Sequence, residues 1–207
     1  NSPPPPIMET PPPPPPTSLR GAGEILAFEP SLQSYQILRQ NCRDVAHVTT
    51  YQKAVSDTDG ELQFYEFPNL YSEYNSSDIR QFEKENWYHE FQPILCKVPC
   101  VSIDRIAAKE NIKPHLIKID VEGAELTVLA GGKDFLQNHS PLVVMEYLSA
   151  ERSNEPHRQA VAFMKVLGYQ TNIIEEDGSL HPVDDLEEWL TDNNTDSDNI
   201  VFQKRNV

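Results

Sequence analysis

Residues 117–125 read IKIDVEGAE, an apolar segment that ends in a carboxylate and turns at a glycine. Its alternating isoleucines favour a strand, and Asp120 stands where that strand leaves the sheet. Gly123 permits a tight turn, and Glu125 then falls in the first turn of a helix, where it complements the helix dipole. The next glycines, at residues 131–132, end that helix. This stretch therefore predicts a strand–turn–helix unit of an α/β domain.

Two further apolar runs end in carboxylates. Residues 25–28 lead into Glu29 and read as a buried strand of a parallel sheet, and residues 142–145 lead into Glu146. In open α/β sheets, ligands bind outside the carboxyl ends of the strands. Acidic side chains there accept hydrogen bonds from ribose hydroxyls or attract a cationic ligand. Glu29, Asp120 and Glu146 are therefore candidate ligand-binding residues.

The remaining pattern alternates strands with helices, which predicts a mostly parallel sheet with a C-terminal antiparallel pair. Residues 68–92 are polar and aromatic, and an insertion of this size is often a lid or a substrate-facing element. Further strands are expected at residues 45–51, 61–67, 94–101, 169–174 and 200–202. Helices are expected at residues 32–42 (with Ser31 as its cap), 103–110 and 155–167, and a short one near 78–85.

Composition narrows the class of protein. The net charge of −15 argues against nucleic-acid binding, which depends on Lys and Arg contacts to phosphates. No apolar run reaches the ~20 residues of a membrane span. Cys96 and Cys100 would lie roughly 13 Å apart on one strand, too far for a disulfide, so cysteine usage favours a soluble, cytoplasmic protein over a secreted one.

The N-terminal residues 1–23 contain proline runs at 3–6 and 11–16. Such a segment adopts extended polyproline II and has little to bury, so it reads as a disordered tail or linker. A ligand for a proline-binding module is the alternative interpretation. The folded domain is expected to comprise residues 24–207.

Several segments together resemble the FkbM family of methyltransferases in order and spacing. They are AFEP at 27–30, AVSD at 54–57, SID at 102–104, IKIDVEGAE at 117–125 and the strand at 141–146. The resemblance covers about residues 24–147. It implies a Rossmann-like class I sheet and an S-adenosylmethionine-dependent enzyme that methylates a hydroxyl oxygen of a sugar, another glycan or a small metabolite.

The same resemblance implies the cofactor contacts. Glu29 would bind the ribose of S-adenosylmethionine, and Ser56 and Asp57 would lie near the adenine.

It also implies the catalytic residues. Asp120 and Glu122 would lie beside the transferred methyl group, and Glu146 would face the acceptor. A carboxylate within reach of the acceptor hydroxyl can act as general base, and Asp120 is the favoured candidate. A metal shared by Asp120 and Glu122 is an alternative, but no suitably spaced histidine supports it. No metal ligand is therefore assigned.

The chain departs from the family before Glu24, where the family's first strand and glycine-rich loop are expected. Polyproline and residues 19–23 (LRGAG) stand there instead. The absent strand would be central, between the strands that end at Glu29 and Asp120, so a sheet edge is expected to be open and homodimerisation becomes reasonable. A truncated fragment, a catalytically inactive binding module and a nucleotide-sugar enzyme remain alternatives to an active methyltransferase.

Overall fold

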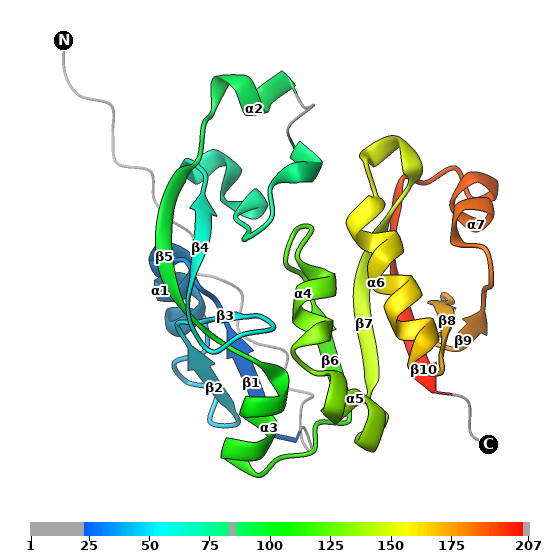
Figure 1. The fold of residues 1–207 in the computed structure, drawn as a ribbon, viewed down its shortest axis with the longest axis horizontal. Helices are drawn as coiled ribbons and strands as arrows, with labels where there is room; N and C mark the ends of the chain where they lie inside the picture. Colours follow the sequence, from blue (N-terminus) through cyan, green and yellow to red (C-terminus); the bar gives the residue numbers. More distant parts are fainter. Residues whose placement is uncertain (1–22, 83–85, 205–207) are drawn as a thin grey trace.

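The computed structural model describes residues 23–82 and 86–204 of the chain. Its strands form three hydrogen-bonded sheets (Figure 1), with strand orders β1-β2, β3-β5-β4 and β6-β7-β10-β8-β9. The strands are β1 (Ile25–Phe28), β2 (Val48–Tyr51), β3 (Ala54–Val55), β4 (Gly60–Glu66), β5 (Ile94–Val101), β6 (Leu116–Ile119), β7 (Leu142–Leu148), β8 (Tyr169–Ile174), β9 (Leu180–Pro182) and β10 (Ser197–Lys204).

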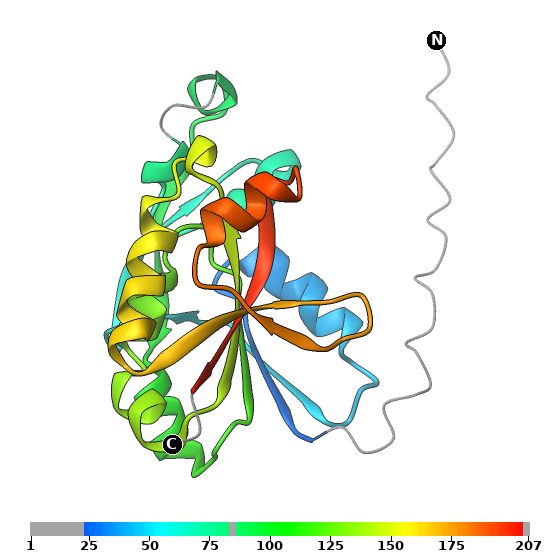
Figure 2. The same cartoon turned by 90° about the vertical axis from the view of Figure 1, so that its right-hand side faces the viewer.

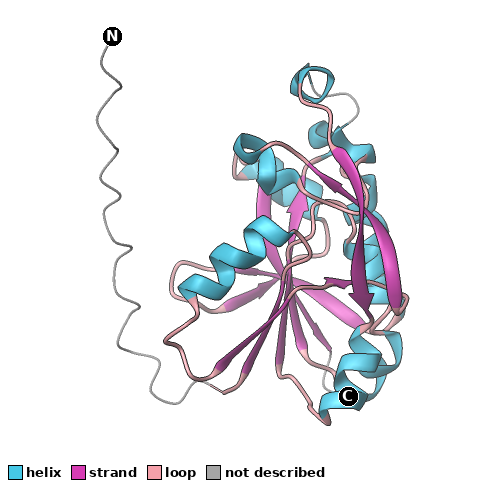
Figure 3. Cartoon of the chain, turned by 90° about the vertical axis from the view of Figure 1, so that its left-hand side faces the viewer, coloured by secondary structure: helices cyan, strands magenta, loops and turns pink. Residues whose placement is uncertain are grey.

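Figure 3 shows the strands spreading as a twisted fan. The α-helices are α1 (Leu32–Asn41), α2 (Asn86–Glu90), α3 (Ile103–Glu110), α4 (Glu125–Ala130), α5 (Lys133–His139), α6 (Glu155–Val166) and α7 (Leu186–Asp192). Three 3₁₀ turns complete the set: η1 (Asn69–Tyr74), η2 (Arg80–Phe82) and η3 (Ala150–Arg152).

The main hydrophobic core lies between the five-stranded sheet and helices α4, α5 and α6, which cover one face of it (Figure 2). Helix α6 shows why the pattern folds this way. Ala160, Met164 and Leu167 recur at helical spacing and all three are buried, as the sequence predicts. They meet β7 and β10, where Val143, Met145 and Phe202 have no exposed surface.

The sheets are mixed, so the prediction of a mostly parallel sheet is wrong. Three strand pairs are parallel: β1–β2, β3–β5 and β6–β7. The other four described pairs are antiparallel, because β10 enters between β7 and β8 in the opposite direction and because β4–β5 and β8–β9 run back on themselves. The predicted C-terminal antiparallel pair is confirmed as β8 with β10.

Strand β1 is found where the sequence places it, but it is not buried. Ile25 is 43% exposed and the other three residues are only half-buried. Within the described part of the chain, β1 pairs with β2 alone and β6 pairs with β7 alone. Among the described residues, β1 and β6 therefore each have one edge without a strand partner.

Helix α1 shares this exposure. Leu32 and Ile37 are 54% and 57% exposed, and none of its residues is fully buried. Ser31 occupies the predicted cap position, but its side chain makes no cap hydrogen bond. The Glu29 carboxylate instead accepts a hydrogen bond from the Ser31 amide at 2.8 Å.

The segment between β4 and β5 holds several short helices in place of the single helix expected near residues 78–85. Within that range only η2 is helical, and residues 83–85 lie outside the described residues. Aromatic packing holds the segment together, since the Trp87 ring stacks on Tyr71 and Tyr74 with centroids 5.4 and 4.5 Å apart. Asn75 adds a hydrogen bond, accepting from the amide of Phe67 at 2.7 Å.

Two observations concern the cysteines and the length of the helices. Cys42, Cys96 and Cys100 are free thiols, and the last two lie on the same strand, β5. Within the described ranges, no helix is long and apolar enough to cross a membrane.

The α4–α5 joint is a close backbone contact. A Cβ atom added to Gly131 would lie 2.0 Å from the carbonyl oxygen of Ser56 and 2.9 Å from the Cα of Asp57. For a Cβ atom added to Gly132, the nearest atoms belong to the side chain of Ile103, at 3.0 Å. Asp104 belongs to one of the segments that resemble the family. Its carboxylate caps α5 by accepting hydrogen bonds from the amides of Asp134 and Phe135.

We expect Gly131→Ala to lower the free energy of unfolding by about 3 kcal/mol, because backbone cannot move aside as a side chain can. Gly132→Ala should cost less, since Ile103 can adjust. Urea unfolding followed by circular dichroism would measure both variants. A Gly131→Ala variant as stable as Gly132→Ala would contradict the packing described for this joint.

Candidate functional site

Three carboxylates meet at the carboxyl end of β6, beside β7. Asp120, Glu122 and Glu146 each present an oxygen, and these oxygens lie within 4.8 Å of one another. The parallel register aligns Ile119 with Met145, so Asp120 and Glu146 come next on adjacent strands. We call these three side chains the acidic triad.

Glu146 lies inside a strand and not at its end, which corrects the sequence expectation. Strand β7 continues to Leu148 because β10 pairs with it antiparallel, and Glu146 is opposite Asn199. Strand β6 stops at Ile119. Glu146 is therefore level with the point at which its neighbouring strand leaves the sheet, and this brings it beside Asp120.

Glu122 is the most perturbed member of the acidic triad. Burial is the largest cause that raises its pKa, and together with the neighbouring charges of Glu146, Asp120 and Glu125 it brings the pKa from 4.5 to about 7, while Arg152 acts in the opposite direction. Its backbone adopts a left-handed conformation with φ of 52°, which is uncommon for a non-glycine residue. The turn thus holds a carboxylate that is only partly ionised at neutral pH.

Asp120 has a different environment. It is largely exposed, and its carboxylate lies 3.4 Å from the ammonium of Lys118. This contact neutralises part of its charge at the strand end. The acidic triad therefore combines one exposed, paired carboxylate with two half-buried ones.

A buried pair supports the turn from below. Glu125 accepts a hydrogen bond from the Gly123 amide at 3.1 Å, and its other oxygen lies 3.8 Å from His157 on α6. Burial raises the pKa of Glu125 and lowers that of His157 to about 4, so both groups are driven toward their uncharged forms. Composition and spacing gave no signal for His157, which comes from a distant helix.

The aromatic segment between β4 and β5 is fastened to the same turn. Ser76, which is 1% exposed, donates a hydrogen bond from its hydroxyl to the carbonyl of Val121 at 2.9 Å. Tyr74 lies close enough for the charges of Glu122 and Arg152 to affect its pKa, which burial raises. The predicted substrate-facing insertion thus contacts the acidic triad's own loop.

The three predicted cofactor residues lie on the other two sheets. Glu29 follows β1, where burial raises its pKa and the Glu66 carboxylate raises it further. Ser56 and Asp57 follow β3, where Ser56 is buried and its hydroxyl is 3.3 Å from Asp57. The structure brings together the predicted catalytic residues and leaves the cofactor residues in two separate groups.

Several residues of the site escape sequence reasoning. Glu66, Asn75, Ser76 and Arg152 belong to none of the segments that resemble the FkbM family, and only their position in the fold brings them near the residues around Glu29 or Glu122. Glu66 had one weak signal, a carboxylate near the end of a predicted strand.

The acidic triad could also hold a divalent cation, since carboxylate oxygens are the ligands that Mg²⁺ and Ca²⁺ prefer. Each of the three offers one oxygen.

Comparison with known proteins supports one family. A family model described as the methyltransferase FkbM domain matches residues 15–171. A search of curated proteins gave no match. Among solved structures, the chain is similar to the methyltransferase FkbM from Methylobacillus flagellatus KT, with 16% sequence identity and a TM-score of 0.46. That match covers 86% of this chain and 36% of the other, so this chain spans about a third of the relative's length.

The family model spans well over half of the chain, and its range contains the acidic triad together with Glu29, Ser56 and Asp57. The chain belongs to the FkbM methyltransferase family.

Proposed function

We propose that this chain carries the catalytic edge of an S-adenosylmethionine-dependent O-methyltransferase that acts on a hydroxyl of a sugar or small metabolite. The observation that carries the proposal is the acidic triad of Asp120, Glu122 and Glu146, whose oxygens lie within 4.8 Å of one another. Family membership supports methyl transfer, and the triad provides the groups that proton removal from a hydroxyl requires.

The chain's residues fit such a cofactor at three points. Glu29 places a carboxylate at the carboxyl end of β1, suited to the hydroxyls of a ribose. The acidic triad provides negative charge for a sulfonium cation, and partial burial strengthens that attraction. Ser56 and Asp57 would then offer polar contacts to an adenine.

S-adenosylmethionine, when bound, supplies a methyl group made electrophilic by its sulfonium. The protein must align the acceptor oxygen and accept its proton, and alignment contributes much of the rate. Glu122 suits the proton-accepting role better than Asp120, because an efficient base has a pKa near the working pH and that of Glu122 is about 7. Asp120, paired with Lys118, would orient the acceptor and help hold the pKa of Glu122 high.

A cation held by the triad is the alternative means of activating the hydroxyl. Binding and transfer assays with and without EDTA separate the two mechanisms, since a carboxylate base is indifferent to a chelator.

Calorimetry of S-adenosylmethionine binding to the 207-residue chain tests the proposal. We expect micromolar binding that Glu29→Gln weakens about tenfold, which corresponds to about 1.4 kcal/mol. Glutamine is chosen because it can still accept the hydrogen bond from the Ser31 amide. Asp120→Asn should weaken binding by a similar factor through loss of charge.

Glu24→Gln is the matched control, because Glu24 is exposed and precedes the same strand. Its affinity should equal that of the wild type. A folded wild-type chain that binds no S-adenosylmethionine would reject catalysis by this chain and favour an interaction module.

The pKa of Glu122 also predicts a pH dependence of stability. The folded-state pKa of Glu122 is raised from 4.5 to about 7. The favourable contribution of this carboxyl to the free energy of unfolding is therefore complete below pH 4.5, and it is lost as the pH rises toward 7. Glu122→Gln removes this loss. The variant should therefore gain about 1–2 kcal/mol on the wild type between pH 4.5 and 8, after allowance for partial exposure.

Chemical denaturation in EDTA at several pH values measures this difference. Glu188→Gln, at an exposed position of α7, serves as the control and should follow the wild type at every pH. A stability difference between Glu122→Gln and wild type that does not change with pH would show that Glu122 is ionised normally.

A further inference from the structure

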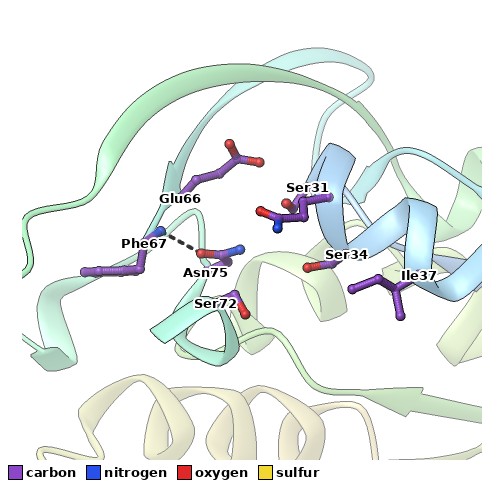
Figure 4. A pocket seen from close by; sticks show the side chains of 8 residues that line it. Ser31, Ser34, Ile37, Glu66, Phe67, Ser72 and Asn75 are labelled. Atoms are coloured by element: carbon purple, nitrogen blue, oxygen red, sulfur yellow. Dashed lines mark hydrogen bonds between the residues drawn. The ribbon is translucent and has the colours of Figure 1, made fainter. Parts of the chain in front are cut away.

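A second feature of the fold is a pocket of about 200 Å³ between α1 and the β4–η1 segment. It has room for about six or seven water molecules, or one small ring. Its walls include side chains from both segments (Figure 4): Ser31, Ser34, Glu66, Phe67, Ser72 and Asn75. None of the six residues assigned to the cofactor or the catalytic step lines it.

The residues that line the pocket are linked to both parts of the proposed site. On one wall, Ser31 donates its amide hydrogen to Glu29. On the other wall, Asn75 immediately precedes Ser76, whose hydroxyl is bonded to Val121 in the loop of the acidic triad. The pocket wall is therefore linked to the carboxyl end of β1 by a hydrogen bond from Ser31, and to the loop after β6 through Ser76, the chain neighbour of Asn75.

The chemistry of the walls defines what can bind. Hydroxyl and amide groups can both donate and accept hydrogen bonds, and the Glu66 carboxylate only accepts. Among the described lining residues none is Lys or Arg, and a second carboxylate, Glu29, is near enough to feel the charge of Glu66. A phosphate would be repelled, whereas a neutral group rich in O–H donors would be held.

The apolar part of the wall limits the shape of the ligand. Ile37 forms it, on the α1 side, whereas the ring of Phe67 points away from the polar groups (Figure 4) and packs against Phe82 and Trp87. A ring with hydroxyls at its edge and carbon–hydrogen faces satisfies both kinds of wall. An extended charged chain does not.

We propose that this pocket binds a neutral, hydroxyl-bearing ring, with Glu66 accepting hydrogen bonds from its hydroxyls and Ser34 contacting its edge. The ring is either the ribose of a nucleoside or the sugar ring of an acceptor, which share this chemistry. The assignment rests on the proposed function for the role of the ring, but the binding itself is independent of methyl transfer.

The test is amide chemical-shift mapping of the ¹⁵N-labelled 207-residue chain with four probes: adenosine, methyl α-glucoside, adenosine 5′-monophosphate and glucose 6-phosphate. We expect one neutral probe to shift the amides of Ser34, Glu66 and Asn75, and its phosphorylated counterpart to bind at least fivefold more weakly. Shifts with adenosine identify a nucleoside pocket, and shifts with the glucoside identify an acceptor pocket.

Two variants and their controls give the test its specificity. Ser34→Trp fills the pocket and should abolish binding, whereas Gln36→Trp, at an exposed position of the same helix, should not. Glu66→Gln should weaken binding about tenfold by removing a charged acceptor, whereas Glu61→Gln, exposed on the same strand, should have no effect. Glu66→Gln keeps the test decisive if Ser34→Trp fails to fold.

Three results would overturn the proposal: no shifts at the pocket amides with either neutral probe, equal binding of the phosphorylated probes, or unchanged binding in Glu66→Gln. Calorimetry with S-adenosylmethionine distinguishes this failure from failure of the proposed function. Chemical-shift changes at the pocket without S-adenosylmethionine binding would support the pocket and reject the proposed function. S-adenosylmethionine binding without such changes would support the proposed function and reject the pocket.

Discussion

The parallel pairing of β6 with β7 is the constraint on which the candidate site depends. Because Ile119 is level with Met145, the next residues on the two strands are both acidic and lie side by side. Like charges this close repel, so the arrangement persists only because the strands beneath are fixed by a core in which Val143 and Met145 are completely buried. The free energy gained by burying the apolar core thus offsets the electrostatic repulsion among the carboxylates at its edge.

The turn after β6 places Glu122 where this repulsion raises its pKa. Glu122 is held by a left-handed backbone and partial burial, and both its surroundings and its acidic neighbours favour the protonated form. Support comes from two directions: Glu125 with His157 below the turn, and Ser76 above it. A carboxyl with a pKa near 7 at a strand end is typical of a functional site more than of a solvated surface.

The remaining features of the site come from separate sheets. The proposed ring pocket joins α1 to the β4–η1 segment, and the packing of Gly131 against Ser56 joins α4 to the three-stranded sheet. Among the described residues, these contacts connect parts of the chain that belong to different sheets. The open edges of β1 and β6 lie between them, so side-chain and loop contacts, and not sheet hydrogen bonds, set the spacing across this region.

The sequence by itself determined the type of most elements, the family and the members of the acidic triad, because apolar periodicity, turn glycines and the IKIDVEGAE stretch are local signals. It could not show that the sheets are mixed or that Glu146 lies inside β7, since both depend on where β10 inserts. Nor could it find Glu66, Ser76 or His157, which reach the site from distant segments. Tertiary structure alone decided these points, because strand neighbours and the desolvation of Glu122 arise only when remote parts of the chain pack together.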